Sequence, residues 1–313
     1  MHPTLTYELR ASFEGDSKTA AHTKEQLIDW LLMNGVESFV EGELAVDINQ
    51  DQDAPPRDYY TELGGDRTPM SVYRYSRESL DDLQVKLNKA FALRVTTAIH
   101  AMTTETWMEG WKESFLPFAT EVFYVKPPWR NEPAERAGLV DLVIEPGMAF
   151  GTGQHATTQL CLEQIGADYL EFGKALGVPR RSVLDVGTGT GILLIGAKKL
   201  GYGTCLGTDI EDDAILAAEE NGRLNGVTVP FKKGSLPQDG STYDLVLANI
   251  LAVVLIRIMD DLAAATNQGG RLILSGLLTD EAPEVIARGV QSGLKFVRQG
   301  SLLDWGCVVM EKV

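Results

Sequence analysis

The spacing of apolar and polar residues divides the chain into two regions of different pattern. Residues 7–13 alternate as a half-buried strand does, and residues 23–33 carry apolar residues along one helical face. The same region contains further predicted strands at 36–44, 70–75 and 94–102 and a helix at 80–91. This order is the split β-α-β unit of a ferredoxin-like fold, so residues 1–102 are predicted to form a small α+β domain.

From residue 182 onward, strands and helices alternate. We predict strands at 182–187, 205–210, 229–234, 243–250 and 271–277, and helices at 191–200, 213–224, 252–265 and 280–292. Such alternation indicates a parallel sheet covered by helices on both faces. Two last strands, 295–300 and 305–312, have no room for a crossover helix between them, which predicts an antiparallel pair at the sheet edge.

The middle of the chain, residues 103–145, has another character. It is crowded with aromatic residues and interrupted by prolines, which favours an ordered connection between domains. A substrate-facing aromatic surface is the alternative. Residues 146–313 then form the second, α/β domain.

The amino-acid composition indicates which kind of macromolecule the protein binds. The chain has 313 residues, 44% of them apolar, which is enough for about two domains with hydrophobic cores. Its 44 acidic and 28 basic residues give a formal charge of −16. Because a phosphate backbone needs a cationic surface, we expect no direct nucleic-acid binding and a basic partner instead.

The cysteines, the first residues of the chain and the length of its apolar runs indicate the cellular compartment. Cys161, Cys205 and Cys307 lie far apart and outside any metal-ligand spacing, so neither a disulfide framework nor a metal site is predicted. The first residues lack a signal pattern, and no apolar run is long enough to span a bilayer. We expect a cytoplasmic protein with no membrane partner.

A glycine-rich turn follows the first strand of the alternating region. Gly187, Gly189 and Gly191 stand where the backbone must turn tightly into a helix and can let a ligand approach. A dinucleotide fingerprint would have its third Gly or Ala one residue later. With Asp185 two residues before the first glycine, the pattern is typical of S-adenosylmethionine-dependent methyltransferases; a dinucleotide site and a purely structural turn are the alternatives.

Two further polar residues end strands of the same predicted sheet. Asp209 ends the second strand, where a carboxylate can accept both hydroxyls of a ribose; capping the following helix is the alternative. Asn249 ends the fourth strand, at the edge where open α/β sheets bind ligands. Its amide oxygen could accept a hydrogen from an attacking amine, although Asn is also an ordinary turn residue.

Upstream, a Gly-rich loop leads into a helix predicted at 159–165. We assign Phe150 and Gly151 of this loop to the cofactor site. Thr158, in the first helical turn, could hold a carboxylate through its hydroxyl and backbone N–H groups. His155 could act as a base, but an unspecialised polar loop residue is the favoured interpretation.

From about residue 107 to the C-terminus, the chain resembles the PrmA-type methyltransferases, which modify the large-subunit ribosomal protein L-eleven. The resemblance is carried by the Pro146 to His155 loop with Thr157-Thr158, by the glycine turn, by Asn249-Ile250-Leu251-Ala252, and by Leu274-Ser275-Gly276 with the later Asp304-Trp305.

The resemblance implies a class I, Rossmann-like domain with a mostly parallel seven-stranded sheet and an antiparallel edge, preceded by a ferredoxin-like domain that recognises the ribosomal protein. It implies that Thr158, Gly187, Asp209 and Asn249 bind S-adenosylmethionine. The expected reaction is methyl transfer to a lysine ε-amine or an N-terminal α-amine, leaving S-adenosylhomocysteine.

Three rival functions stay open at this point. The same fold could methylate another protein or a small-molecule amine, or it could sense S-adenosylmethionine without catalysis, although retention of Asn249 disfavours the latter. A nucleic-acid amine methyltransferase would usually have Pro-Pro and an aromatic residue after Asn249 to stack a flipped base. Here Ile250, Leu251 and Ala252 follow instead.

Overall fold

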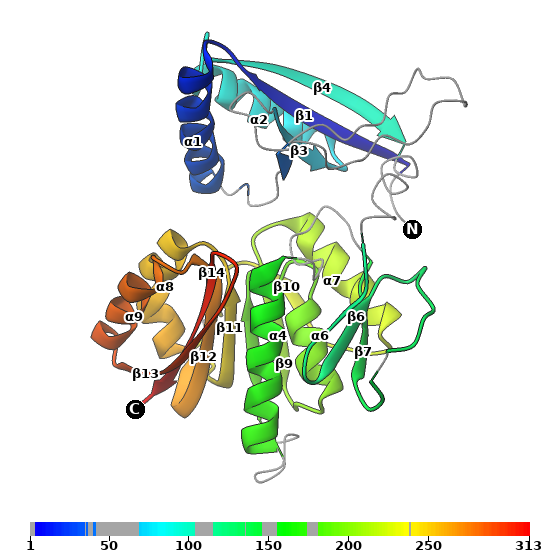
Figure 1. Cartoon of the computed structure of the whole chain (residues 1–313), viewed down its shortest axis with the longest axis vertical. Helices are drawn as coiled ribbons and strands as arrows, with labels where there is room; N and C mark the ends of the chain where they lie inside the picture. Colours follow the sequence, from blue (N-terminus) through cyan, green and yellow to red (C-terminus); the bar gives the residue numbers. More distant parts are fainter. Residues whose placement is uncertain are drawn as a thin grey trace. The chain divides into compact units, whose positions relative to one another are not determined.

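The computed structural model describes residues 4–34, 36, 40–41, 69–103, 115–134, 136–145, 155–173, 181–237 and 239–313. The chain divides into two compact units, Met1–Ser114 and Phe115–Val313, which are described separately (Figure 1).

The described residues of the first unit form a four-stranded antiparallel sheet with two helices. Its elements are β1 (Leu5–Phe13), α1 (Ser17–Met33), β2 (Val40–Glu41), β3 (Met70–Arg74), α2 (Arg77–Ala90) and β4 (Val95–Thr103). The strands lie in the order β2-β3-β1-β4, and every neighbouring pair is antiparallel. The element order agrees with the sequence-based expectation; of the strand expected at 36–44, mainly β2 lies within the described residues.

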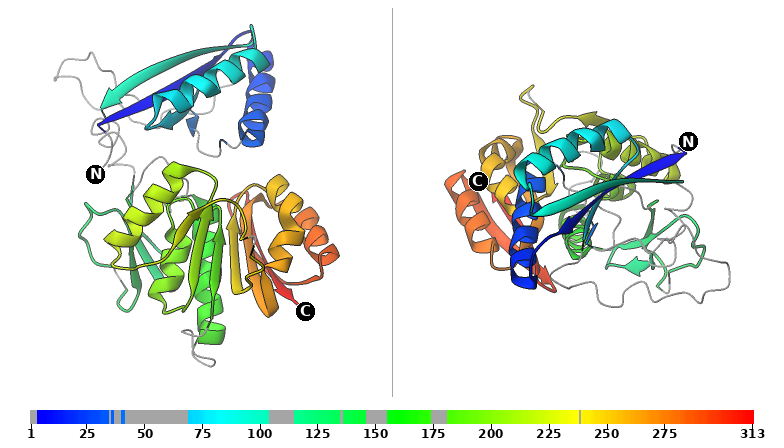
Figure 2. Two further views of the ribbon diagram at one scale, coloured as in Figure 1. Left: turned by 180° about the vertical axis from the view of Figure 1, so that it is seen from behind. Right: turned by 90° about the horizontal axis from the view of Figure 1, so that it is seen from above.

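Helix α1 begins six residues earlier than the apolar pattern suggests. The Asp16 side chain accepts a hydrogen bond from the Thr19 N–H (2.8 Å), which caps the first turn. Both helices pack on one face of the sheet (Figure 2). Leu27 and Leu87 of the helices and Leu9 and Val72 of the strands belong to a single core.

The second unit begins at Phe115, within the aromatic segment, and the described residues of the segment from there on are part of its fold. Strands β5 (Phe118–Ala119), β6 (Phe123–Lys126) and β7 (Val140–Val143) form a small sheet. Phe123 is fully buried and packs with Leu142 against α6 (Ile192–Lys199), where Gly196 leaves room for its ring. The sequence predicted an ordered connection here, but strands this short, between prolines, left too weak a periodicity to be recognised.

The main sheet has seven strands in the order β10-β9-β8-β11-β12-β14-β13. These are β8 (Val183–Val186), β9 (Cys205–Asp209), β10 (Phe231–Lys233), β11 (Tyr243–Asn249), β12 (Thr266–Leu278), β13 (Leu294–Leu302) and β14 (Trp305–Lys312). The first five are parallel, and β14 is antiparallel to both neighbours. The predicted fold class and antiparallel edge are confirmed, with β14 inserted between β12 and β13.

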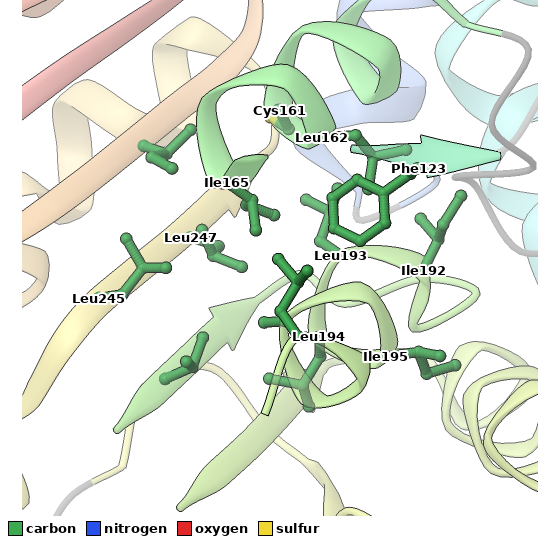
Figure 3. Packing of buried hydrophobic residues seen from close by; sticks show 14 of the residues in the cluster. Phe123, Cys161, Leu162, Ile165, Ile192, Leu193, Leu194, Ile195, Leu245 and Leu247 are labelled. Carbon is green, nitrogen blue, oxygen red and sulfur yellow. The ribbon is translucent and has the colours of Figure 1, made fainter. Parts of the chain in front are cut away.

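Helices cover both faces of this sheet. They are α4 (Ala156–Asp168, continued by the π-helical turn Tyr169–Gly173), α6 (Ile192–Lys199), α7 (Asp212–Leu224), α8 (Ala252–Ala264) and α9 (Ala282–Gln291). Along β11, Leu245 and Leu247 face α4 and α6 (Figure 3), while Val246 and Ala248 face the α8 and α9 side. The strand interior is thus apolar on both faces. Its polar residue Asn249 lies at the carboxyl end of the strand.

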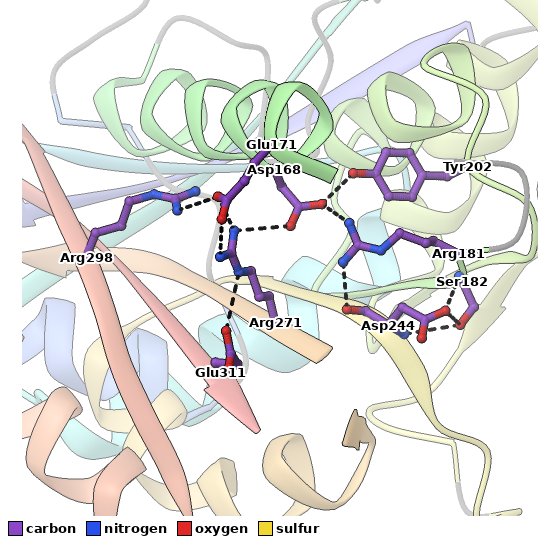
Figure 4. Close-up of polar contacts among 9 residues, drawn as sticks. All are labelled: Asp168, Glu171, Arg181, Ser182, Tyr202, Asp244, Arg271, Arg298 and Glu311. Atoms are coloured by element: carbon purple, nitrogen blue, oxygen red, sulfur yellow. Dashed lines mark hydrogen bonds and ion pairs between the residues drawn. The ribbon is translucent and has the colours of Figure 1, made fainter. Parts of the chain in front are cut away.

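A buried ion network holds the C-terminal end of α4 (Figure 4). The Asp168 carboxylate is fully buried and accepts hydrogen bonds from Arg181 and from the Tyr202 hydroxyl (2.6 Å). Arg271 of β12 lies 3.6 Å from Asp168 and makes two hydrogen bonds to Glu171 (2.7 and 2.8 Å). Anchoring this end of α4 fixes where its first turn lies along the sheet.

Candidate active site

The glycine turn joins β8 to α6 as the sequence predicts. Gly187, Gly189 and Gly191 have φ values of +70°, +53° and +79°, which only glycine adopts readily. Gly191 is the N-cap of α6 and contributes no side chain to the first helical turn. The tight strand-to-helix turn is therefore observed directly.

Packing supplies a second reason for glycine in this turn. A Cβ on Gly187 would lie 2.5 Å from Cγ2 of Ile250, and one on Gly191 would lie 3.0 Å from Cβ of Ala218 and 3.1 Å from the Phe231 ring. The turn thus lies directly against Ile250, the residue after β11, and against α7 and β10. This closeness could not be predicted from the glycine spacing.

Asp209 ends β9 and binds the glycine turn. Its side chain is 9% exposed; Oδ2 accepts a hydrogen bond from the Gly189 N–H (2.9 Å), and Oδ1 accepts one from the Glu211 N–H (3.0 Å). Burial raises the pKa of this carboxyl, and the backbone N–H groups partly oppose the rise. Each oxygen can accept more than one hydrogen bond, so both keep capacity for a ligand hydroxyl.

Capping of α7 by Asp209, the alternative that the sequence left open, is not observed. The N-cap residue is Glu211, and no side chain caps it. The hydrogen bond from the Glu211 N–H to Asp209 stabilises the loop before the helix. The other oxygen of Asp209 accepts the hydrogen bond from Gly189.

Asn249 and Thr158 lie 91 positions apart in the chain, yet the structure brings them together. The Asn249 Nδ2 donates to Oγ1 of Thr158 over 3.4 Å, with Asn249 8% exposed and Thr158 fully buried. The Thr158 N–H donates to the His155 carbonyl within the first turn of α4 (3.1 Å). Since that N–H is already used, the hydroxyl is the group of Thr158 that meets Asn249.

The other amide atom of Asn249 is an acceptor that the described residues leave unsatisfied. Its Oδ1 is buried and has no hydrogen-bond partner there. Leaving a buried acceptor without a donor costs about 1–3 kcal/mol. An unsatisfied oxygen at the carboxyl edge of a parallel sheet is therefore suited to receive an N–H group from a ligand.

His155 lies beside this pair and has a structural role. It is the N-cap of α4: its Nδ1 accepts from the Thr157 N–H (3.4 Å) and lies 2.8 Å from the Thr157 hydroxyl. Its ring packs edge-to-face against Trp305, with the centroids 4.6 Å apart. Burial lowers the pKa of His155, which favours the neutral ring.

Sequence analysis did not assign two residues that the structure places at this edge. Trp305 reaches it from the β13–β14 hairpin, which only the strand order shows. Asp185 is 1% exposed, and its Oδ2 accepts a hydrogen bond from the Thr188 hydroxyl (2.6 Å). Burial, with a smaller contribution from the charge of Asp209, raises the pKa of Asp185 to about 7. The signal for Asp185 was present in the glycine motif.

Phe150 and Gly151, also assigned to the cofactor site, lie outside the described residues. The remaining predicted residues form two clusters at the carboxyl ends of β8, β9 and β11: the glycine turn with Asp209, and Thr158 with Asn249. Ile250 connects them, because its side chain packs on Gly187.

Comparison of the sequence with known proteins identifies its family. The family described as "Ribosomal protein L11 methyltransferase (PrmA)" matches residues 16–313. A "Ribosomal protein L11 methyltransferase" of Geobacter sulfurreducens is 44% identical over 208 residues, which are 66% of this chain and 66% of that protein. Another, of Geotalea uraniireducens, is 33% identical over 288 residues, 80% of this chain and 91% of that protein.

A solved structure is similar to part of this chain. The "ribosomal protein L11 methylase" of Lactobacillus delbrueckii subsp. bulgaricus is 30% identical, with a TM-score of 0.54, and the match covers 62% of this chain and 96% of that one. Among the described residues, no helix is both long and apolar enough to cross a membrane.

The strand order, with a glycine turn, an acid and an amide at the carboxyl edge, defines the class: the Rossmann-like, S-adenosylmethionine-dependent methyltransferases. Within that class, the chain belongs to the family of ribosomal protein L11 methyltransferases.

Proposed function

We propose that this protein transfers methyl groups from S-adenosylmethionine to amines of ribosomal protein L11, at lysine ε-amines, the N-terminal α-amine or both, in the cytoplasm. The observation that supports it most is the buried, unsatisfied Oδ1 of Asn249 beside Thr158. When bound, the cofactor supplies a methyl group on a sulfonium.

The residues present suit that cofactor. Asp209 accepts the two ribose hydroxyls with the lone pairs that Gly189 and Glu211 leave, and its charge makes these hydrogen bonds strong. The glycine turn lets the backbone approach the ligand. Thr158, with Phe150 and Gly151 of the preceding loop, holds the methionine end.

Asn249 orients the acceptor. Its Oδ1 accepts an N–H hydrogen of the neutral amine and so aims the nitrogen lone pair along the S–CH₃ axis. A sulfonium and a neutral amine become a thioether and an ammonium, so the total charge does not change and alignment is the main contribution. Only about one in 10³ lysines is neutral near pH 7. Exclusion of water around the bound amine would disfavour its ammonium form and so raise the fraction that can react.

In this proposal, residues 1–102 recognise the substrate protein and residues 146–313 carry the chemistry. Residues 103–145 join the two, and from Phe115 onward they belong to the same compact unit as the chemistry. The formal charge of −16 suits a basic ribosomal protein. No metal takes part, since methyl displacement at a sulfonium needs none.

Asn249→Ala tests the proposal. We expect kcat for methylation of L11 to fall roughly 100-fold, because the amine is no longer aimed, while the Kd for S-adenosylmethionine changes much less. Kinetics with labelled cofactor and purified L11, together with calorimetry, measure the two quantities.

The matched control is Asn267→Ala, which removes an Asn side chain that bonds Asp244 at the opposite end of the sheet. It should leave kcat unchanged. Equal losses of kcat and cofactor affinity in Asn249→Ala would make Asn249 a cofactor contact only, and absence of label on L11 with the unaltered protein would contradict the substrate assignment.

A further inference from the structure

The hairpin between β13 and β14 contains an apolar side chain in an unfavourable position. Leu303 and Asp304 form its two-residue turn, and Leu303 has φ +53°. A hairpin turn with positive φ at its first central residue favours glycine, because a Cβ there is crowded. Leu303 is nonetheless 83% exposed, so burial of its side chain within the unit does not compensate this strain.

Leu303 belongs to a small surface of mixed character. Leu278, at the end of β12, is 38% exposed and pairs with Trp305, and the Thr279 N–H donates to the Asp304 carbonyl (2.9 Å). Asp280 and Asp304 are exposed alongside. We call Leu278, Asp280, Leu303 and Asp304 the hairpin rim: two exposed leucines accompanied by two exposed carboxylates.

The hairpin rim is continuous with the candidate active site. Trp305, the residue after Asp304, packs against His155 at a centroid distance of 4.6 Å. His155 caps the helix whose Thr158 bonds Asn249. A chain bound on the hairpin rim would therefore lie next to the residues that receive the amine.

From these observations we propose that the hairpin rim binds the segment of ribosomal protein L11 that carries the acceptor amine. This inference rests on the proposed function. The leucines give apolar contact, and the carboxylates attract a cationic chain, which matches the charge of a basic substrate protein. A role of the Leu303 side chain in binding would explain why a leucine occupies this strained, exposed position next to the candidate active site.

Leu303→Gly separates this role from a structural one. Glycine suits the observed φ, so the variant should not have a lower Tm. Loss of one leucine contact should raise the KM for L11 about tenfold. We expect kcat and the Kd for S-adenosylmethionine to be unchanged, because no active-site group is touched.

The carboxylates are tested by the double variant Asp280→Asn, Asp304→Asn. Its KM for L11 should exceed that of the unaltered protein at low salt and depend less on ionic strength.

Val290→Ala is the matched control for Leu303→Gly. It removes an apolar side chain that is 54% exposed and that lies about 12 Å along α9 from the end of the helix near the rim. Its KM should not change.

An unchanged KM in Leu303→Gly would overturn the proposal, as would an equal rise in Val290→Ala. A dimer of the unaltered protein that Leu303→Gly converts to monomer would assign the rim to a second copy of the chain and also overturn it. Failure of the unaltered protein to methylate L11 is a different result: it contradicts the proposed function, and the occupant proposed for the rim falls with it.

Discussion

At the scale of single residues, the two buried acids of the candidate site, Asp185 and Asp209, differ in the hydrogen bonds that their carboxyl groups accept. Asp209 receives N–H groups on both oxygens, whereas Oδ1 of the more deeply buried Asp185 has no partner among the described residues. Hydrogen bonds to a carboxylate favour its charged form and desolvation disfavours it. The two carboxyls should therefore respond differently to substitution.

Asp209→Ala should weaken S-adenosylmethionine binding at least about tenfold. The change removes two charge-assisted hydrogen bonds to the ribose, each of roughly 1.5–3 kcal/mol before compensation, and frees the glycine turn. Calorimetry measures the affinity. Asp212→Ala, which removes an exposed acid paired with Lys233, is the control and should bind normally; an unchanged Kd in Asp209→Ala would exclude the ribose assignment.

Asp185→Asn should change how stability depends on pH. The folded-state pKa rises from 3.8 to about 7, so the folded protein retains a proton that the unfolded chain releases. The free energy of unfolding therefore falls as pH rises from about 4 to about 7, by about 4 kcal/mol at most. Asn does not titrate, so the free energy of unfolding of the variant does not fall in this way. Compared with the unaltered protein, the variant should therefore be more stable at pH 8 than it is at pH 5.

Urea unfolding at the two pH values, without cofactor, measures the effect of Asp185→Asn. Thr188 can still donate to the amide oxygen, so the hydrogen bond is retained. Parallel pH profiles for the two proteins would show that Asp185 is not the responsible group.

At the scale of elements, the ends of β8, β11 and β12 are held together at Ile250. Its side chain packs on Gly187, and a Cβ on Gly276 would lie 2.4 Å from its carbonyl oxygen. The Ile250 N–H donates to the carbonyl of Ser275, the register partner of Asn249 (3.1 Å). The position of Asn249 therefore depends on backbone contact with β12.

Gly276→Ala should destabilise the fold by at least about 2 kcal/mol and lower kcat, since the backbone next to Asn249 must move. Gly269→Ala is the matched control: it lies in the same strand with φ +72° against +82° and has no atom within 4 Å of the added Cβ. It should cost only about 1 kcal/mol, from backbone strain. Equal losses of stability, measured in urea, would contradict a role for the Ile250 contact.

At the scale of the whole molecule, each compact unit has its own hydrophobic core. In the first unit, Leu9, Leu27 and Leu80 belong to a cluster that contains no residue of the second unit. All described residues assigned to the candidate site belong to the second. Cofactor binding should therefore be separable from recognition of the substrate protein.

A truncation that begins at Thr103 should bind S-adenosylmethionine with nearly normal affinity. Its kcat/KM for L11 should fall roughly 100-fold or more, because docking no longer raises the effective concentration of the amine. Methylation of a short lysine peptide, which is too small to use the first domain, is the control and should be unaffected. Full activity on L11 would give residues 1–102 another role.

Much of this architecture follows from short-range patterns. Alternating strands and helices, the glycine turn and the polar residues that end β9 and β11 are local features, since burial on two sheet faces and positive φ impose their residue types directly. The antiparallel last pair follows from a connection too short for a helix. The elements of the sheet were predicted within a few residues, except that β12 begins five residues earlier than predicted; in the first unit, α1 begins six residues earlier.

Other features depend on contacts between distant parts of the chain. The insertion of β14 beside β12, the small sheet of β5, β6 and β7, and the contact of Ile250 with Gly187 and Gly276 leave no local pattern. Whether Oδ1 of Asn249 is satisfied depends on which donors surround it after folding. The sequence by itself determined the class of fold and the residue types of the site; burial, strand order and hydrogen-bond satisfaction were decided by the tertiary structure, because these are properties of neighbours that only folding brings together.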